Sequence, residues 1–282
     1  MTTTPTNPDL FRLDGRIAIV TGGMGRLGSE YVRALAAAGA HVAVFDLETT
    51  PSPTIASLIA QRSPVFTYAV DIIDRAAVHA AMDAVAARMG TPTILVNNAG
   101  VGSPPNAPAA ENGPFEDYPE SSWDVMLDSH LKGALLVSQA FVRHFKAARG
   151  ASPQIDGSIV NVSSTYGLVS PDQSVYDYRR RGGVEYYKPI GYSVAKSGVL
   201  NFTRWLAEYG APFGLRVNTL VPGGVQEAAH APEFVAEYVK RTPLGRMARD
   251  DEYNGAIVFL ASRASVYMTG AMLVVDGGWT AR

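Results

Sequence analysis

The stretch Arg16–Gly28, RIAIVTGGMGRLG, joins a short apolar run to a turn that is rich in glycine. The β-branched first half predicts a buried strand, and the residues from Leu27 onward follow the pattern of an Ala-rich helix. Between strand and helix, Gly23, Gly25 and Gly28 form the pattern G-x-G-x-x-G. Glycines there permit a tight turn and a close approach to a pyrophosphate, which a helix N-terminus attracts. The stretch therefore predicts a dinucleotide-binding turn.

The alternation of strand and helix continues along the chain. Further strands are expected at His41–Phe45, Val65–Val70, Thr93–Val96, Ser158–Val162, Leu215–Val221 and Met272–Val275. Helices are expected at Leu27–Ala38, Asp74–Met89, Ser121–Ala148, Tyr192–Tyr209 and Asp250–Leu260. This order predicts the α/β fold class. We expect one domain over residues 1–282, a doubly wound, Rossmann-type parallel sheet of about seven strands with helices on both faces.

The ends of these helices carry recognisable signals. Asp74 and Ser121 are expected N-caps, and Gly39, Gly90 and Gly150 stand where helices end in a left-handed residue. Three connecting segments are long: 102–119, rich in Pro and Ala, 167–189, rich in Tyr and Arg, and 223–248. Since ligands bind beyond the carboxyl ends of parallel strands, 102–119 and 167–189 are candidate substrate lids, with surface insertions as the alternative, and 223–248 is a candidate substrate-side loop.

The composition restricts the class of protein. The 282 residues include 24 Lys and Arg, 26 Asp and Glu, and no cysteine. A near-neutral chain without a basic cluster argues against nucleic acid or a membrane surface as partner. Without cysteine there are no disulfides, thiol nucleophiles or Cys-based zinc sites, and five scattered histidines suggest no metal. Lacking a long apolar stretch and the pattern of a signal peptide, the chain is expected in the cytoplasm.

Asp46 lies at the end of the second expected strand, about 20 residues after the glycine turn. A carboxylate in this place accepts hydrogen bonds from the adenosine ribose and repels a 2′-phosphate. We therefore expect the cofactor NAD, with NADP less favoured. Arg26 is a cation beside the expected phosphate site, and we expect it to contact the pyrophosphate or to point outward.

Tyr192 and Lys196 stand four residues apart, which places a phenol and an ammonium on one face of a helix. A tyrosine with its ordinary pKa of about 10 is a poor base near neutrality. The neighbouring ammonium and the positive nicotinamide of an oxidised cofactor would lower that pKa. Ser163 and Ser164 follow the fifth expected strand and bring hydroxyl groups to the same edge of the sheet. Together these residues indicate an acid/base site.

From about residue 13 to residue 280, the chain resembles the short-chain dehydrogenase/reductase superfamily. The motifs that carry the resemblance are Thr21–Gly28, Asp71, Asn97–Gly100, Asn161–Ser164, Tyr192 with Lys196, Pro222–Gly223 and Val275–Gly278. The resemblance implies that Tyr192 is the acid/base, that Lys196 holds the nicotinamide ribose and tunes Tyr192, and that Ser164 bonds the reacting oxygen. It also implies that Asp71 caps the adenine and that the 222–225 backbone meets the nicotinamide amide.

The resemblance and the glycine turn together define an expected cofactor site, for which a small set of residues is predicted. They are Gly22, Gly25, Arg26, Leu27, Asp46, Asp71, Ile72, Asn97, Asn98, Ala99, Gly100, Tyr192, Lys196, Pro222, Gly223 and Val225.

The chain departs from the family pattern at three places. Arg26 stands where the single-domain branch has a glycine, a spelling of the turn that resembles the extended branch of the family. His130 stands where the family has the asparagine of a catalytic tetrad, and it could relay a proton through water to Lys196 or be a structural histidine. A relaying His130 is expected to add an ionisation near a histidine pKa.

The third departure is the long spacing between Ser164 and Tyr192, which stand 28 residues apart. The extra segment contains seven residues suited to substrate contact, because Tyr and Arg stack on flat faces and donate hydrogen bonds. They are Tyr176, Tyr178, Arg179, Arg180, Arg181, Tyr186 and Tyr187. A solvated loop or a loop between subunits is the alternative.

These features predict an oxidoreductase that moves hydride between a secondary alcohol and nicotinamide, acting on a small-molecule substrate that we expect to be a sugar, polyol or sugar acid. A reductase of a hydrophobic ketone, such as a steroid or acyl chain, is the main competitor. A nucleotide-sensing protein without turnover and a sugar-nucleotide epimerase are further alternatives. The apolar faces of the helices at 121–148 and 192–209 indicate, by the resemblance, a homodimer or homotetramer.

Overall fold

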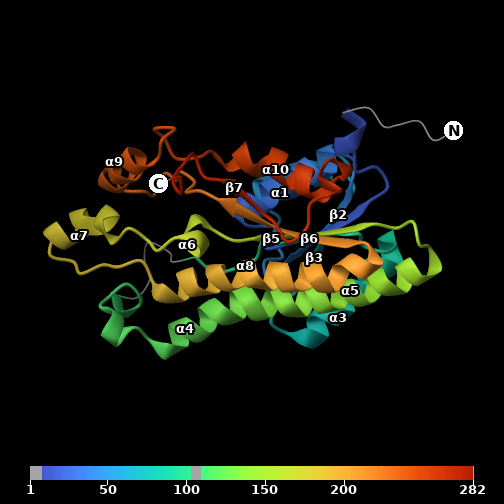
Figure 1. The fold of residues 1–282 in the computed structure, drawn as a ribbon, viewed down its shortest axis with the longest axis horizontal. Helices are drawn as coiled ribbons and strands as arrows, with labels where there is room; N and C mark the ends of the chain where they lie inside the picture. The colour runs from blue at the N-terminus through green and yellow to red at the C-terminus, as the bar shows by residue number, and fades with distance from the viewer. Residues whose placement is uncertain (1–7, 103–108, 282) are drawn as a thin grey trace.

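The computed structural model describes residues 8–102 and 109–281 (Figure 1). Seven parallel strands form one sheet in the order β3-β2-β1-β4-β5-β6-β7. The strands are β1 Ile17–Thr21, β2 His41–Asp46, β3 Val65–Ala69, β4 Ile94–Asn97, β5 Gly157–Val162, β6 Leu215–Pro222 and β7 Met272–Val275. The predicted doubly wound sheet is confirmed, and each expected strand is present to within a residue or two.

Helices cover both faces of this sheet (Figure 1). On one face lie α1 Arg26–Ala37, α2 Pro53–Ala60 and α10 Asn254–Ala261, and on the other α3 Arg75–Met89, α5 Gly133–Ala151 and α8 Ile190–Gly210. Two separate apolar clusters fill the layers. Tyr31 and Ile257 belong to the first cluster, and Phe141 and Leu206 to the second. Because the central strands β1, β4 and β5 are buried on both faces, they read in the sequence as largely apolar runs, whereas the edge strands β3 and β7 are partly exposed.

Most helix boundaries follow the sequence signals. The Asp74 side chain caps α3 by accepting hydrogen bonds from Ala76 N and Ala77 N at 2.8 and 3.2 Å. Gly39 and Gly90 end their helices with positive φ angles of 105° and 102°. The expected helix Asp250–Leu260 opens with a 3-10 turn, Asp250–Tyr253, before α10. Four α-helices of the described residues were not predicted. They are α2, whose eight residues are too few and too apolar to show a period, α9 Pro232–Arg241, and the short helices α6 Thr165–Leu168 and α7 Asp177–Arg181.

Two boundary predictions are wrong. Ser121 does not cap a helix, because α4 Glu120–Leu127 begins one residue earlier after Pro119. Gly150 does not stop α5, which continues to Ala151. In the first case the helix begins before the residue that could have capped its start, and in the second it continues past the residue that could have ended it.

The expected single helix over 121–148 is interrupted. Between α4 and α5, residues Asp128–Lys132 form a π-helical turn, with His130 buried at its centre. A π turn inserts an extra residue into the helical ladder and is frequent at functional sites. The interruption aims the His130 ring across the site instead of along the helix surface.

The segment 167–189 is not an unstructured loop. It contains the end of α6 Thr165–Leu168, the 3-10 turn Gln173–Tyr176 and α7 Asp177–Arg181. Tyr176 and Tyr186 pack with Tyr238 and Trp279 in a third apolar cluster. This aromatic packing fixes the insertion against α9, at the end of the molecule where α6, α7 and α9 gather (Figure 1).

Sheet order decides where a ligand can bind. β1 lies between β2 and β4. From β1 the chain adds β2 and β3 on one side, and it then adds β4 to β7 on the other side. Such a switch point leaves a crevice beyond the carboxyl ends of the strands. The glycine turn after β1, the segment after β4 and the serines after β5 all lie at these ends.

Candidate active site

The glycine turn has the geometry of a phosphate-binding turn. Gly22 has a φ of +63°, and its N–H donates to Phe45 O at 2.7 Å. A Cβ on Gly28 would lie 2.0 Å from Gly22 O, so only glycine lets α1 pack this closely on the turn. These contacts leave the N-terminus of α1 facing the crevice. The positive φ therefore falls on Gly22, one residue before the pattern that begins at Gly23.

A pocket of about 680 Å³ follows this crevice. It is lined by ten of the residues predicted to bind the cofactor: Gly22, Gly25, Arg26, Leu27, Asp46, Asp71, Ile72, Asn98, Ala99 and Gly100. Its lining also includes neighbours that were not predicted, among them Met24, Leu47, Ile73 and Ser129. Three of these flank predicted residues in the chain, while Ser129 comes from the π turn, which had no signal in the sequence.

Asp46 is held at the rim of this pocket. Its carboxylate accepts hydrogen bonds from Met24 N at 2.8 Å and from Glu48 N at 3.1 Å. These contacts orient the carboxylate beside the glycine turn, at the place where a Rossmann-type fold meets the adenosine ribose. The side chains of Glu48 and Asp71 line the same pocket. The ribose end of the crevice is therefore acidic.

The Arg26 guanidinium reaches the segment after β6. It forms ion pairs with Glu227 at 3.0 Å and Asp250 at 2.5 Å and donates to Gln226 O. These partners were not predicted, and the expectation that the partly exposed Arg26 contacts the pyrophosphate or points outward stays a prediction. Arg26 lines both this pocket and the neighbouring one, and it ties the start of α1 to the expected substrate-side loop.

Two adjacent asparagines have different roles. Asn98 lines the crevice, and its amide donates to Thr21 O and Gly22 O at 3.1 Å each, which joins β4 to the glycine turn. Asn97 is buried within the sheet, where its amide donates to Asn161 Oδ1 at 2.8 Å and Ser138 Oγ at 3.0 Å. Asn97 is absent from the lining of the crevice, so its expected cofactor contact is corrected to a structural one.

A second pocket, of about 310 Å³, holds the predicted catalytic pair Ser164 and Tyr192. Ser164 begins α6, and its Oγ accepts a hydrogen bond from Tyr166 N at 3.2 Å. Gly223 and Val225 line the same pocket, directly after Pro222, which ends β6. The structure thus brings Ser164, Tyr192, Gly223 and Val225 together from three separate parts of the chain.

Lys196 lies beside Tyr192 on α8, with its ammonium 5.8 Å from the centre of the Tyr192 ring. The ammonium donates to Val162 O at 2.9 Å. Burial lowers the pKa of Lys196 to about 8. Burial also raises the pKa of Tyr192, against a hydrogen bond with Ser164 that lowers it. The expected lowering of the Tyr192 pKa by Lys196 is therefore not found in the protein alone, where burial has the larger effect.

His130 contacts Tyr192 and lines a small cavity together with Lys196. Its ring meets the Tyr192 ring edge to face at 5.6 Å, and its Nε2–H donates to Val101 O at 2.9 Å. Nδ1 is then the acceptor nitrogen, and it is buried without a partner among the described residues. Burial, and secondarily Lys196, lower the pKa of His130 to about 3. This lowering favours the neutral imidazole near pH 7, so the structure gives no support for an extra ionisation near an ordinary histidine pKa.

Both expected substrate segments reach the catalytic pocket. Tyr176 and Lys188 come from the insertion, and His230, Phe234 and Tyr238 come from the segment 223–248. The three arginines expected to touch substrate lie elsewhere. Arg180 pairs with Asp177 and donates to Gln173 O and Tyr186 O, so it braces the insertion, and Arg179 stacks on Tyr186 at 4.3 Å.

A family model described as enoyl-(acyl carrier protein) reductase matches residues 25–280. The chain is 36% identical over 276 residues to D-threitol dehydrogenase of Mycolicibacterium smegmatis, covering 96% of this chain and 95% of the relative. The chain belongs to the short-chain dehydrogenase/reductase family. The chain is therefore an oxidoreductase of this family that acts on CH–OH groups.

Other members of the family differ in substrate. A 3-alpha-(or 20-beta)-hydroxysteroid dehydrogenase of Mycobacterium tuberculosis is 34% identical over 270 residues, covering 96% of this chain and 91% of the relative. The solved structure of a short-chain type dehydrogenase/reductase from Mycobacterium marinum matches with a TM-score of 0.83 and 28% identity, covering 99% and 100% of the two chains. A gluconate 5-dehydrogenase from Burkholderia cenocepacia, in complex with NADP and tartrate, matches at 0.82 and 30%, covering 98% and 100%.

Within residues 8–102 and 109–281, no helix is both long enough and apolar enough to cross a membrane.

Proposed function

We propose that this chain is an NAD-dependent dehydrogenase of small polyhydroxylated substrates, namely polyols, sugars or sugar acids. The observation that supports the proposal is the density of polar groups around the catalytic tyrosine. Ser164, Thr165, Tyr176, Lys188, Glu227, His230 and Tyr238 all line the pocket that contains Tyr192. A substrate with several hydroxyl groups can form hydrogen bonds with such a lining, whereas a plain hydrocarbon would form none there.

The residues of the pocket have distinct tasks in the reaction. Ser164 Oγ binds the oxygen of the reacting alcohol, and Tyr192 Oη takes its proton. Bound NAD supplies the hydride acceptor. Lys196, beneath the Tyr192 ring, places a positive charge beside the phenol and stabilises its anion. The nearby glycine turn, Asp46 and the residues after β4 would hold the dinucleotide.

The preference for NAD is supported by the acidic ribose end of the crevice. Asp46, Glu48 and Asp71 line it, and the guanidinium of Arg26 is engaged by Glu227 and Asp250. A 2′-phosphate would therefore meet negative charge without a free arginine from this turn. The gluconate 5-dehydrogenase of Burkholderia cenocepacia was solved with NADP, so membership of the family does not decide the cofactor, and the charge at this end carries the proposal.

A hydrophobic ketone is the second candidate. Phe234, Tyr238 and Met247 give the pocket apolar surface, and the mycobacterial hydroxysteroid dehydrogenase is 34% identical to this chain. The polar lining opposes this candidate, and a substrate panel separates the two.

The test is reduction of NAD and, separately, of NADP by polyols, sugars, sugar acids and hydroxysteroids, followed by nicotinamide absorbance. We expect NAD reduction by at least one polyhydroxylated compound, and loss of about 10²- to 10⁴-fold in kcat for Tyr192→Phe. Tyr209→Phe, at the far exposed end of the same helix, is the matched control and should keep wild-type activity. A clear preference for NADP, or activity with steroids alone, would contradict the proposal.

A further inference from the structure

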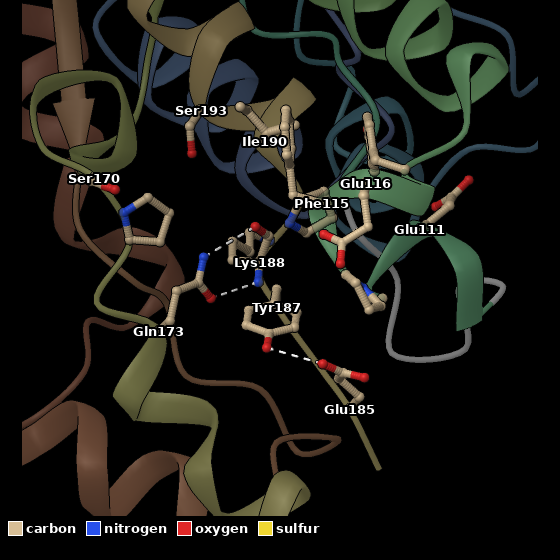
Figure 2. A pocket seen from close by; sticks show the side chains of 15 residues that line it. Glu111, Phe115, Glu116, Ser170, Gln173, Glu185, Tyr187, Lys188, Ile190 and Ser193 are labelled. Atoms are coloured by element: carbon tan, nitrogen blue, oxygen red, sulfur yellow. Dashed lines mark hydrogen bonds between the residues drawn. The ribbon is translucent and has the colours of Figure 1, made fainter.

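Lys188 is placed at the catalytic site by the backbone of the insertion. Its N–H donates to Gln173 Oε1 at 2.9 Å, and Gln173 Nε2 donates to Lys188 O at 3.4 Å. Figure 2 shows this pair of hydrogen bonds between the two residues. Pro189 and the start of α8 follow directly, and Tyr192 is the third residue of that helix. The position of Lys188 relative to Tyr192 is therefore held by the two hydrogen bonds to Gln173 on one side and by helix α8 on the other.

The Lys188 ammonium lies 4.8 Å from the centre of the Tyr192 ring. The side chain lines two adjoining pockets, the catalytic one and a pocket of about 440 Å³ seen in Figure 2. Lys196 approaches the same ring but donates to Val162 O inside the protein. The two lysines thus have different surroundings: Lys196 has a backbone partner, and Lys188 faces open space.

No carboxylate of the described residues pairs with Lys188, although several lie in the two pockets. Glu227 is engaged by Arg26, Glu185 accepts from the Tyr187 hydroxyl at 3.1 Å, and Glu111 accepts from Ser122 Oγ at 2.8 Å. Burial lowers the pKa of Lys188 to about 8, and no carboxylate opposes this shift. Holding an ammonium in a partly desolvated site without a counter-charge costs free energy.

An anionic ligand would remove that cost and gain a charge-assisted hydrogen bond. The other ionisable groups of the pocket do not compete for it. Arg26 is paired with two carboxylates, and burial lowers the pKa of His230, which favours its neutral form. Lys188 is therefore the positive charge of the catalytic pocket that is open to a ligand.

We propose that Lys188 recognises a carboxylate on the substrate, so that the enzyme acts on small hydroxy acids. This inference rests on the proposed function and narrows it from polyols, sugars and sugar acids to the acids. The carboxylate binds the Lys188 ammonium while the hydroxyl to be oxidised lies between Ser164 and Tyr192. Lys188 is a specificity-determining residue and takes no part in proton transfer.

The test compares acids with polyols of equal carbon number: D-gluconate with D-sorbitol, and D-threonate with D-threitol. Dissociation constants are measured by calorimetry on the NADH-loaded enzyme, which cannot oxidise the added compounds, and kcat and KM by absorbance of the nicotinamide with NAD. The variants are Lys188→Met and Lys188→Arg. Lys240→Met is the matched control, because Lys240 is exposed on α9 and pairs with Glu237.

We expect the wild-type enzyme to bind at least one acid ten-fold or more tightly than its polyol. Lys188→Met should weaken acid binding by about 10- to 100-fold, the effect of one hydrogen bond to a charged group. It should change polyol binding by less than about three-fold, because a ligand without a charge loses no ion pair. Lys188→Arg should restore most of the acid affinity, and Lys240→Met should leave both unchanged.

Three outcomes would overturn the inference. The first is a wild-type enzyme that binds the acids no more tightly than the polyols, including one that binds neither. The second is a Lys188→Met variant that loses affinity for acid and polyol equally. The third is a fall in kcat for both classes with an altered pH profile, which would make Lys188 a tuning residue for Tyr192. Failure of every compound to reduce NAD contradicts the proposed function instead, and the binding comparison still decides the role of Lys188.

Discussion

Burial sets the charge of the side chains at the centre of the site. It lowers the pKa of His130 to about 3 and that of Lys196 to about 8, and it raises the pKa of Tyr192. The imidazole is neutral at pH 7 and keeps one acceptor nitrogen, Nδ1, without a protein partner among the described residues. A small cavity lined by His130 and Lys196 adjoins it. His130 can therefore support a relay through water only as a neutral hydrogen-bonding group, not as an acid that titrates during turnover.

We expect His130 to make the fold acid-sensitive. The unfolded chain takes up a proton on this residue below its ordinary pKa of about 6.5, whereas the folded protein holds it neutral down to about 3. Stability from this group is thus fully present above pH 6.5 and falls as the pH drops through that window. The slope is at most about 1.4 kcal/mol per pH unit. Urea unfolding of the wild type and of His130→Asn between pH 4.5 and 7.5 measures it.

The variant should lose stability less steeply on acidification than the wild type. His41→Asn, at the exposed start of β2, is the control and should retain the wild-type slope. Parallel slopes for wild type and His130→Asn would show that the imidazole is not held neutral in the folded protein.

At the scale of elements, Arg26 joins the first residue of α1 to the segment that lines the substrate pocket. The contacts to Gln226, Glu227 and Asp250 connect residues about 200 positions apart in the chain. A glycine at position 26, as in the family pattern, would have no side chain to make them. In this chain, the glycine turn is therefore connected through Arg26 to the segment after β6, which lines the neighbouring pocket.

We expect Arg26→Ala to loosen this segment. The guanidinium and its partners are partly exposed, so the stability cost should be about 1 kcal/mol or less. The larger effect should be a several-fold rise in the KM for substrate, because Val225, Glu227 and His230 line its pocket. Hydrogen exchange should be faster across 223–250. Arg33→Ala removes an ion pair from the same helix and is the control. Unchanged exchange and KM in Arg26→Ala would disprove the connection.

At the scale of the whole molecule, an apolar face remains uncovered on α4, α5 and α8. Val125, Leu135, Trp205 and Tyr209 are 53, 40, 64 and 45% exposed. Trp205 and Tyr209 stack at 5.5 Å, and Lys146 of α5 lies over the Tyr209 ring, so side chains of both helices contribute to the face. Figure 1 shows α4, α5 and α8 on one side of the sheet. An exposed apolar surface of this kind usually marks an interface.

We propose that two copies of the chain pack on this face, in a homodimer or homotetramer. Trp205→Arg should reduce the mass measured by light scattering after size exclusion, because it places a charge in an apolar contact. Ile59→Arg introduces the same charge at an exposed apolar residue on the opposite side of the sheet, and it should leave the mass unchanged. A wild-type mass equal to one chain, or no change in Trp205→Arg, would exclude the interface.

The order of the strands and of the long helices, the glycine turn, and ten of the residues that line the crevice could be predicted from the sequence. These follow from local patterns: unbroken apolar runs for buried strands, and glycines where Gly22 and Gly28 leave no room for a side chain. Ser164 was predicted because it follows a parallel strand, and such strands end at one edge of the sheet. Tyr192 was predicted from its four-residue spacing to Lys196, and the resemblance to the family supported both residues.

Only the tertiary structure decided what the charged and insertion residues do. Arg26 was predicted beside the phosphates, yet its partners come from the far end of the chain. The arginines of the insertion brace its fold, and Lys188 reaches the pocket instead. His130 is neutral because its neighbours bury it. Each outcome depends on burial and on contacts between distant segments, and neither quantity is encoded in the spacing of residues along the chain.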